Sequence, residues 1–246
     1  MELEPVLDMP ALHMRGANKW VCVADLHLGI EVQLRHAGFN IPSQAPRMLS
    51  SLETLAAHGN RLLILGDVKH RIPSVSYRED REIPPLMEKL LNVYKEIVIV
   101  SGNHDGSLSS ILPPEVKAYS GNGTIIEDVG AFHGHVWPSA EAMSGRKLLM
   151  AHIHPSVVLK DSLGSKMNEK CWVRAKLRKG QVKERYEFCP EELVIIPAFN
   201  PLLTGTPVNT VSGSTFGPLF RNEMVNRRSL RVYLLDGSNL GLPKRI

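Results

Sequence analysis

The stretch EIVIVSGNHDGS, residues 96–107, joins an almost unbroken aliphatic run to a cluster of polar residues. The run is too short for a typical helix and is rich in Val and Ile, which predicts a buried β-strand. The residues that follow it directly are Gly102, Asn103, His104 and Asp105. Burying three such polar side chains at a strand end would be costly without partners, so we expect them to serve a functional site.

Similar apolar runs recur along the chain and predict further strands at 20–25, 61–66, 147–152 and 192–197. Helical patterns at 43–58 and 83–94 separate the first three strands, the second beginning with prolines. This βαβαβ order is typical of a mostly parallel α/β sheet. After Gly106 shorter strands with Gly turns are expected near Ile125 and Ile126 and at 131–133, 172–177, 185–188 and 229–235.

Length and composition favour a single domain over residues 1–246, because 246 residues with 43% hydrophobic content can bury a sizeable core and no repeat or low-complexity linker divides them. Neither a run of 18 apolar residues nor a secretory N-terminus is present, which predicts a cytoplasmic protein without membrane contact. Three cysteines without CxxC spacing argue against both a disulfide framework and a thiolate zinc site, and Cys22 is expected in the core.

Charge is unevenly distributed, since residues 171–246 contain 12 Lys and Arg against 6 Asp and Glu. Such an excess indicates either a polyanionic partner or an ordinary solvated surface. Trp172, which lies among these basic residues, is expected to be packed, with base stacking as the alternative if it is exposed.

Polar clusters follow five of the predicted strands at their carboxyl ends. In a parallel sheet these ends meet at one edge, where ligands bind. The clusters hold seven of the ten histidines and comprise Asp25 and His27, Asp67 and His70, Asn103 and His104, His133 and His135, and His152 and His154.

These residue types point to a metal site. The i, i+2 pairs Asp25-x-His27 and His152-x-His154 would project to one side of extended chain, where each can bind one ion or span two. Asp, Asn and His without Cys suit Mn²⁺, Fe²⁺ or Zn²⁺, and the set exceeds the three or four ligands that one zinc needs. Two ions that hold a phosphate between them would use the whole set, with Asp67 as the bridge and Gly66 allowing close backbone approach.

The ordered motifs DLH at Asp25, GDVKH at Gly66, GNHD at Gly102, HGH at His133 and HIH at His152 resemble those of the calcineurin-like metallophosphoesterases. The resemblance covers residues 20–155. Within that superfamily, ADLHLGIE, GDVKH and PAFNPLLTG are most similar to the small SbcD-related archaeal and DNA-ligase-associated phosphoesterases. Ala151 replaces the family's usual Gly, which should be harmless if its φ is negative.

The resemblance implies a four-layer αββα sandwich with mixed sheets, in which the N-terminal βαβαβ half forms one sheet and strands from 171–246 complete the other. It implies two metal shells that share Asp67 and contain Asp25, His27, Asp67 and His154, and Asp67, Asn103, His133 and His152. His104 would protonate the leaving oxygen, and His70 would contact the scissile phosphate or support a ligand. Asp105 would orient His104 or a ligand. Ligation by His135 is left open.

The sequence thus predicts a dinuclear phosphoesterase that hydrolyses phosphodiester bonds in DNA or RNA, a nuclease related to DNA repair and open to a repair-protein partner. Mn²⁺ is the expected ion, with Fe²⁺, Zn²⁺ and Ni²⁺ as alternatives. A phosphodiesterase or phosphatase acting on nucleotides or small organic phosphates is the alternative function, and a metal-free scaffold is a third hypothesis. No nucleophile elbow, phosphate-binding P-loop or dinucleotide fingerprint supports other chemistries.

Overall fold

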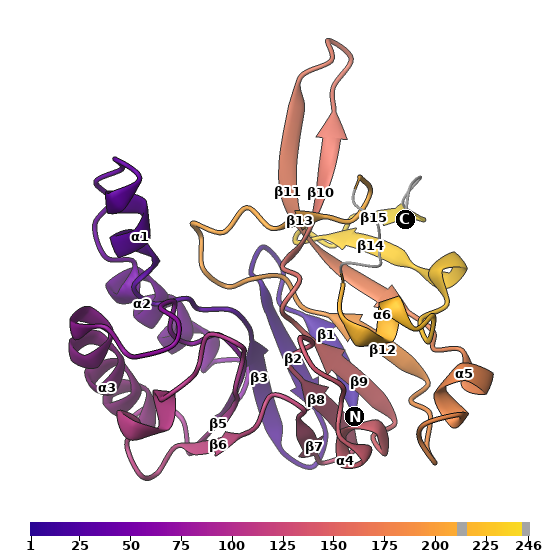
Figure 1. Ribbon diagram of the computed structural model, residues 1–246, viewed down its shortest axis with the longest axis horizontal. Helices are drawn as coiled ribbons and strands as arrows, with labels where there is room; N and C mark the ends of the chain where they lie inside the picture. The colour runs from indigo at the N-terminus through magenta and orange to yellow at the C-terminus, as the bar shows by residue number, and fades with distance from the viewer. Residues whose placement is uncertain (211–215, 243–246) are drawn as a thin grey trace.

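Two mixed β-sheets lie face to face in the computed structural model, which describes residues 1–210 and 216–242 (Figure 1). The first sheet consists of β1 (Glu2–Pro5), β2 (Ala11–Arg15), β3 (Lys19–Val23), β4 (Arg61–Leu65), β5 (Glu96–Val100) and β6 (Lys117–Tyr119) in that order. The pairs β3–β4, β4–β5 and β5–β6 are parallel, whereas β1–β2 and β2–β3 are antiparallel. The expected βαβαβ unit is therefore present as β3, β4 and β5 with helices between them.

The second sheet is built from the rest of the described chain. Its main path is β13 (Thr206–Pro207), β10 (Pro155–Lys160), β11 (Lys166–Ala175), β12 (Glu192–Ile195), β9 (Lys147–Met150), β8 (Val129–Phe132) and β7 (Thr124–Ile126), with β14 (Arg231–Leu234) on β11 and β15 (Asn239–Gly241) on β14. Strands β12, β9 and β8 are parallel. The C-terminal segment contributes β12, β14 and β15 to the second sheet, and its residues 211–215 and 243–246 lie outside the described part.

Side-chain alternation along the strands produces the layers. On β4, Leu62 and Ile64 face the helices, while Leu63 and Leu65 face the second sheet. On β9, Leu149 faces the first sheet, and its neighbours Leu148 and Met150 face outward.

The helices are α1 (Ile30–His36), α2 (Ala45–Leu55), α3 (Tyr77–Leu91), α4 (Ala140–Met143), α5 (Lys179–Lys183) and α6 (Pro218–Arg221), with 3-10 turns at Leu108–Ser110 and Arg227–Ser229.

Helices cover both outer faces, which confirms the four-layer arrangement. Residues of α2 and α3 share one apolar core with the outer face of the first sheet. Residues of α4, α5 and α6 share another core with the outer face of the second sheet. A third core fills the space between the sheets and contains Trp172, which is 1% exposed. Stacking of Trp172 on a base is therefore excluded.

The expected start of α3 is wrong. A capping box between Ser76 and Glu79 starts the helix at Tyr77, and the helix continues through Pro84 and Pro85, which the sequence analysis placed at its beginning. No strand forms at 185–188, because the chain turns there after α5 and the Tyr186 hydroxyl donates to the Pro138 carbonyl oxygen (2.8 Å). The short helix α1 and the antiparallel strands β1 and β2 were not expected.

Two further features bear on the earlier expectations. Strands β10 and β11 form a hairpin that projects from the sandwich (Figure 1). All three cysteines are free, and Cys22 is buried as expected. In the described ranges 1–210 and 216–242, no helix is long and apolar enough to cross a bilayer.

Candidate metal centre

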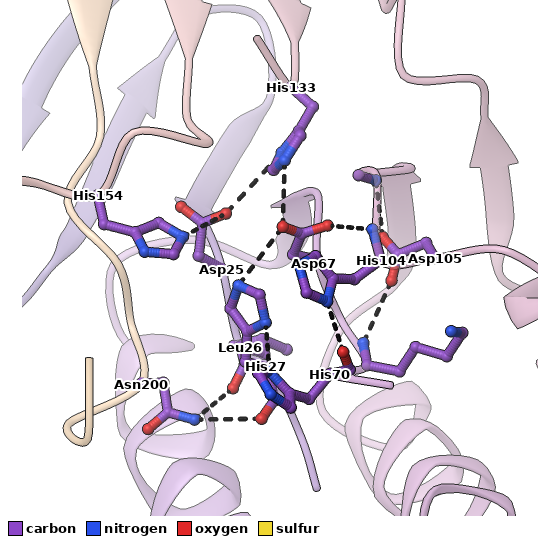
Figure 2. Close-up of polar contacts among 12 residues, drawn as sticks. Asp25, Leu26, His27, Asp67, His70, His104, Asp105, His133, His154 and Asn200 are labelled. Carbon is purple, nitrogen blue, oxygen red and sulfur yellow. Dashed lines mark hydrogen bonds and ion pairs between the residues drawn. The ribbon is translucent and has the colours of Figure 1, made fainter. Parts of the chain in front are cut away.

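Polar side chains from both sheets converge at one edge of the sandwich. Figure 2 shows Asp25 after β3, Asp67 after β4 and His133 after β8 pointing toward one another, with His154 approaching from beyond β9. The predicted strand ends therefore meet as expected, because the parallel strands of each sheet end on the same side of the molecule.

One donor group contains ligand atoms that all lie within 4.8 Å of one another, and its members are Asp25, His27, Asp67 and His154. His27 Nε2 is 3.4 Å from Asp67 Oδ2, and His154 Nε2 is 3.5 Å from Asp25 Oδ1. These four residues match the first metal shell that the family resemblance implied.

A second donor group contains Asp67, His133 and His152. His133 Nε2 lies 3.3 Å from Asp67 Oδ2, the same oxygen that faces His27. The other oxygen of Asp67 accepts a hydrogen bond from the backbone N–H of His104 (2.8 Å). One carboxylate oxygen thus faces a histidine of each group, which is the arrangement that a bridging ligand requires.

The donors fit divalent cations. Five of their buried atoms have no hydrogen-bond partner among the described residues, namely both carboxylate oxygens of Asp25 and the Nε2 atoms of His27, His133 and His154. Buried polar atoms without partners are costly, and cations bound at the two donor groups would satisfy all five. Carboxylate and imidazole donors without thiolate suit Mn²⁺, Fe²⁺, Zn²⁺ or Ni²⁺.

The backbone at these ligands is unusual. Asp25, His27, Asp67, His152 and His154 all have positive φ, between 41° and 70°. The i, i+2 pairs therefore converge through left-handed turns. The expectation that they lie in extended chain is wrong. Such conformations cost on the order of 1–3 kcal/mol each and persist where the surroundings impose them, as at binding sites. Ala151 is not among the positive-φ residues, so its replacement of Gly causes no strain.

Two glycines are required by contacts with ligands. A Cβ on Gly66, whose φ is 83°, would lie 1.9 Å from His133 Nδ1. A Cβ on Gly102 would lie 2.0 Å from Asp67 Oδ1. Gly102 has no positive φ, so it is needed for this close approach to Asp67 and not for a left-handed turn.

Hydrogen bonds orient the two histidines that face Asp67. His133 Nδ1 bonds the Leu65 carbonyl oxygen (3.2 Å), and His27 Nδ1 bonds His70 Nδ1 (3.1 Å). In each ring Nε2 is left to face Asp67 as a potential ligand atom. An acceptor bonded to Nδ1 keeps the proton on that nitrogen and fixes the ring plane, so that Nε2 stays free of a proton.

Burial and charge set the protonation states. Burial lowers the pKa of His27 to about 3 and that of His152 to about 4, so both rings are neutral and able to coordinate at neutral pH. Burial alone would lower the pKa of His133, but Asp67 and Asp25 raise it to about 9. Burial would raise the pKa of Asp67, yet contacts with His133, His27 and the His104 N–H hold it well below the ordinary value. Asp67 is therefore ionised.

His104 lies beside the donor groups. Its Nδ1 bonds the carbonyl oxygen of His70, which leaves Nε2 for another partner. His70 uses both ring nitrogens, one toward His27 and the other toward the Gln33 side-chain oxygen. His27, His70 and His104 also form a third group of potential ligands, but these hydrogen bonds account for their proximity. The geometry favours support of His27 by His70, while its contact with the scissile phosphate stays a prediction.

Asp105 acts through the backbone. Its buried carboxylate accepts hydrogen bonds from the N–H groups of Gly102 (2.7 Å) and Lys69 (3.2 Å), and burial raises its pKa to about 6. It therefore joins the segments after β4 and β5, and its carboxylate bonds no atom of the His104 ring. Asn103 is exposed in the turn between Gly102 and Asp105, so its binding to a metal stays a prediction.

His135 lies outside both donor groups among the described residues, with its ring centroid 5.3 Å from that of His133. Burial lowers the pKa of His135, so it is neutral at neutral pH. The position of His135 favours the alternative that it lies beside His133 without binding a metal.

Sequence reasoning missed Asn200, which follows β12 at the same edge. Its fully buried Nδ2 donates to the carbonyl oxygens of Leu26 (2.7 Å) and His27 (3.3 Å), as Figure 2 shows. The Lys170 ammonium donates to the carbonyl oxygens of Ala198 (2.7 Å) and Asn200 (2.6 Å), and burial lowers its pKa to about 8. These residues hold the turn that carries Asp25 and His27. The signal in the sequence is the place of Asn200 in the stretch PAFNPLLTG, which begins at the end of the strand run ELVIIP but by itself assigns no role to the residue.

Arg174 and Arg178, two basic residues of the C-terminal segment, form ion pairs that do not involve the donor groups. Arg174 makes two hydrogen bonds to Glu192, at the amino end of β12, and Arg178 pairs with Glu223. The carboxyl end of β12 is the end that leads to Asn200, so Arg174 lies toward the opposite edge of the sheet. For these residues the solvated-surface interpretation of the charge excess is the better one.

Comparison with known proteins agrees with this geometry. The family model for calcineurin-like phosphoesterases matches residues 19–233, and the chain belongs to that family. No curated protein matches the chain in sequence. Among solved structures, the nuclease MPE of Pseudomonas putida is 17% identical with a TM-score of 0.58, and the alignment covers 96% of this chain and 98% of that one. YfcE, a phosphoesterase from E. coli, is 16% identical with a TM-score of 0.42, over 90% of this chain and 96% of that one.

The family assignment confirms the fold and the superfamily that the motifs indicated. The chain is thus a member of a family of hydrolases that act on phosphoester bonds. The closer placement beside SbcD-related enzymes stays a prediction.

Proposed function

We propose that the protein is a dinuclear metal-dependent phosphodiesterase that cleaves nucleic acid. The observation that carries the metal requirement is the pair of donor groups that share Asp67, with Asp67 Oδ2 within 3.4 Å of one histidine from each. One set contains Asp25, His27 and His154, and the other contains His133 and His152, with Asn103 as a further proposed ligand. The clustering of these acidic and histidine donors opposes the hypothesis of a metal-free scaffold.

Bound Mn²⁺, or another ion of this class, would neutralise the charge of the phosphate and activate a water molecule for attack on phosphorus. His104 supplies the proton for the leaving oxygen from Nε2, because its Nδ1 is held by the His70 carbonyl oxygen. His70 keeps His27 aligned, and Asp105 fixes the backbone on either side of the site.

A nucleic-acid substrate is supported by the second motif, GDVKH, in which His70 lies three positions after Asp67, because this motif resembles the form seen in the nuclease branch of the family. The structural similarity to a nuclease at 17% identity adds only that this fold accommodates such a substrate. The core shared by the two sheets supports the proposal that residues 1–246 act as one domain. Location in the cytoplasm and a repair-protein partner remain parts of this proposal.

A substrate screen tests the proposal. Purified protein is loaded with Mn²⁺ and assayed on bis-p-nitrophenyl phosphate, p-nitrophenyl phosphate, cyclic nucleotides, and labelled single- and double-stranded DNA and RNA. We expect metal-dependent cleavage of the diester and of nucleic acid, and loss of both in Asp67→Asn, which removes the shared charge. Turnover confined to monoesters or free nucleotides would favour the small-substrate alternative, and no metal-dependent turnover would contradict the enzyme proposal.

A further inference from the structure

A cavity of about 450 Å³ opens beside His104, next to the donor groups. Its walls come from α1, from the loop at 70–76 and from His104 itself. Nine residues line it, and none of these nine has an acidic side chain, whereas Arg71 and His36 can carry positive charge. An anionic ligand would therefore meet attraction and no opposing carboxylate from these walls.

Buried charged groups hold the loop from beneath. The Glu79 carboxylate, 1% exposed as a residue, accepts hydrogen bonds from the backbone N–H groups of His70 (2.9 Å), Arg71 (2.7 Å) and Ser76 (2.6 Å). The ammonium of the buried Lys69 donates to the carbonyl oxygens of Arg71 and Ser74. The backbone of the loop is thus fixed in one position before any ligand arrives.

The side chains on this fixed loop remain available. Arg71 is exposed, and among residues 1–210 and 216–242 its guanidinium has no ion-pair partner within 4.0 Å. Ile72, beside it, is 52% exposed although it is a large apolar residue. A free guanidinium binds phosphate oxygens well, and an apolar side chain offers a surface to the flat face of a base.

We propose that this cavity binds the nucleotide that leaves when the phosphodiester is cleaved. The leaving sugar oxygen lies at His104, the base contacts Ile72, and the next phosphate along the strand pairs with Arg71. The bond between phosphorus and that oxygen breaks as water oxygen bonds phosphorus, and His104 gives its proton to the leaving oxygen. The inference rests on the proposed function, and the volume is within the range of pockets that hold small ligands.

The test uses three thymidine dinucleotides, one without a terminal phosphate, one with a 5′ phosphate and one with a 3′ phosphate. Their kcat/KM values are measured with Mn²⁺-loaded wild-type protein, with Arg71→Ala and Ile72→Ala, and with Arg146→Ala. Arg146 is a matched control, because it is exposed, forms an ion pair with Glu191 and lies at the amino end of β9, away from the cavity.

We expect one of the two terminal phosphates to raise kcat/KM about 10-fold or more in wild-type protein and in Arg146→Ala, the usual effect of a charge-assisted hydrogen bond. Arg71→Ala should lose this gain, and Ile72→Ala should lower kcat/KM for all three dinucleotides. The inference is overturned if neither terminal phosphate helps wild-type protein, or if Arg71→Ala keeps the gain. If wild-type protein cleaves bis-p-nitrophenyl phosphate and nucleic acid but gains nothing from either terminal phosphate, the proposed function stands and only this inference fails.

Discussion

Replacing Asn200 by Ala should weaken one metal site much more than the other. The Asn200 side chain is fully buried, donates to the carbonyl oxygens of Leu26 and His27, and accepts from the Leu202 N–H (2.9 Å). Each buried group left without its partner costs about 1–3 kcal/mol. The turn that these bonds hold has φ values of 55° at Asp25 and 41° at His27, so its backbone is strained and can relax once the bonds are lost.

Relaxation of this turn moves Asp25 and His27, which belong to the first donor group. It does not move His133 or His152, which belong only to the second. Removal of a group that orients metal ligands typically lowers metal affinity about 10- to 100-fold. Titration with Mn²⁺ by calorimetry should therefore show one ion bound with near wild-type affinity and one bound 10- to 100-fold more weakly.

The matched control is Asn209→Ala. Asn209 also bonds backbone twice, at the N–H (3.0 Å) and the carbonyl oxygen (2.9 Å) of Val158, but on strand β10 and not at the metal ligands. We expect Asn209→Ala to lose stability while it retains both ions. Equal weakening of both sites in Asn200→Ala, or unchanged binding of both ions, would refute the reasoning.

Three further changes test other parts of the structure. His104→Ala should keep the metal content by elemental analysis but lower kcat about 10²- to 10⁴-fold for an alkoxide leaving group and less for p-nitrophenolate, and equal slowing of both would contradict its role as the acid. Gly102→Ala should lose metal and about 1–3 kcal/mol of stability by urea unfolding, because its Cβ would contact Asp67, whereas Gly180→Ala, with no atom within 4 Å of the added Cβ, should do neither. Burial would raise the pKa of Glu79, but hydrogen bonds from backbone N–H groups lower it below the ordinary value. The ionised carboxylate therefore stabilises the fold fully above the unfolded pKa of about 4.3, and this stabilisation is lost as pH falls through the folded pKa. Glu79→Gln should thus cost about 1–3 kcal/mol at pH 7, with a gap to wild type that narrows below about pH 4; a gap independent of pH would contradict this.

Much of the fold and site could be predicted because the relevant signals are local. Short Val- and Ile-rich runs separated by helical patterns indicate parallel strands, and parallel strands bring Asp25, Asp67 and His133 to one edge. The capping box of Ser76 and Glu79 is also a local signal for the start of α3. The prolines at the centre of this helix resemble a helix start as well, and they led to a predicted start that is too late in the chain.

The remainder depends on contacts between distant parts of the chain. Asn200 bonds Leu26 across 174 positions, which no local pattern can indicate. The left-handed backbone at His152 and His154 results from the surroundings, since non-glycine residues rarely adopt it unaided. The bond between His70 and His27 likewise joins two loops, so this contact could be recognised only in the structure.

The location of the metals is the most direct test of the central claim. Crystals soaked in Mn²⁺ and measured for anomalous scattering should show two peaks about 3.5–4 Å apart. One peak should lie among Asp25, His27 and His154, the other beside His133 and His152, with Asp67 between them. A single peak at full Mn²⁺ occupancy, or two peaks that do not share Asp67, would contradict a dinuclear centre.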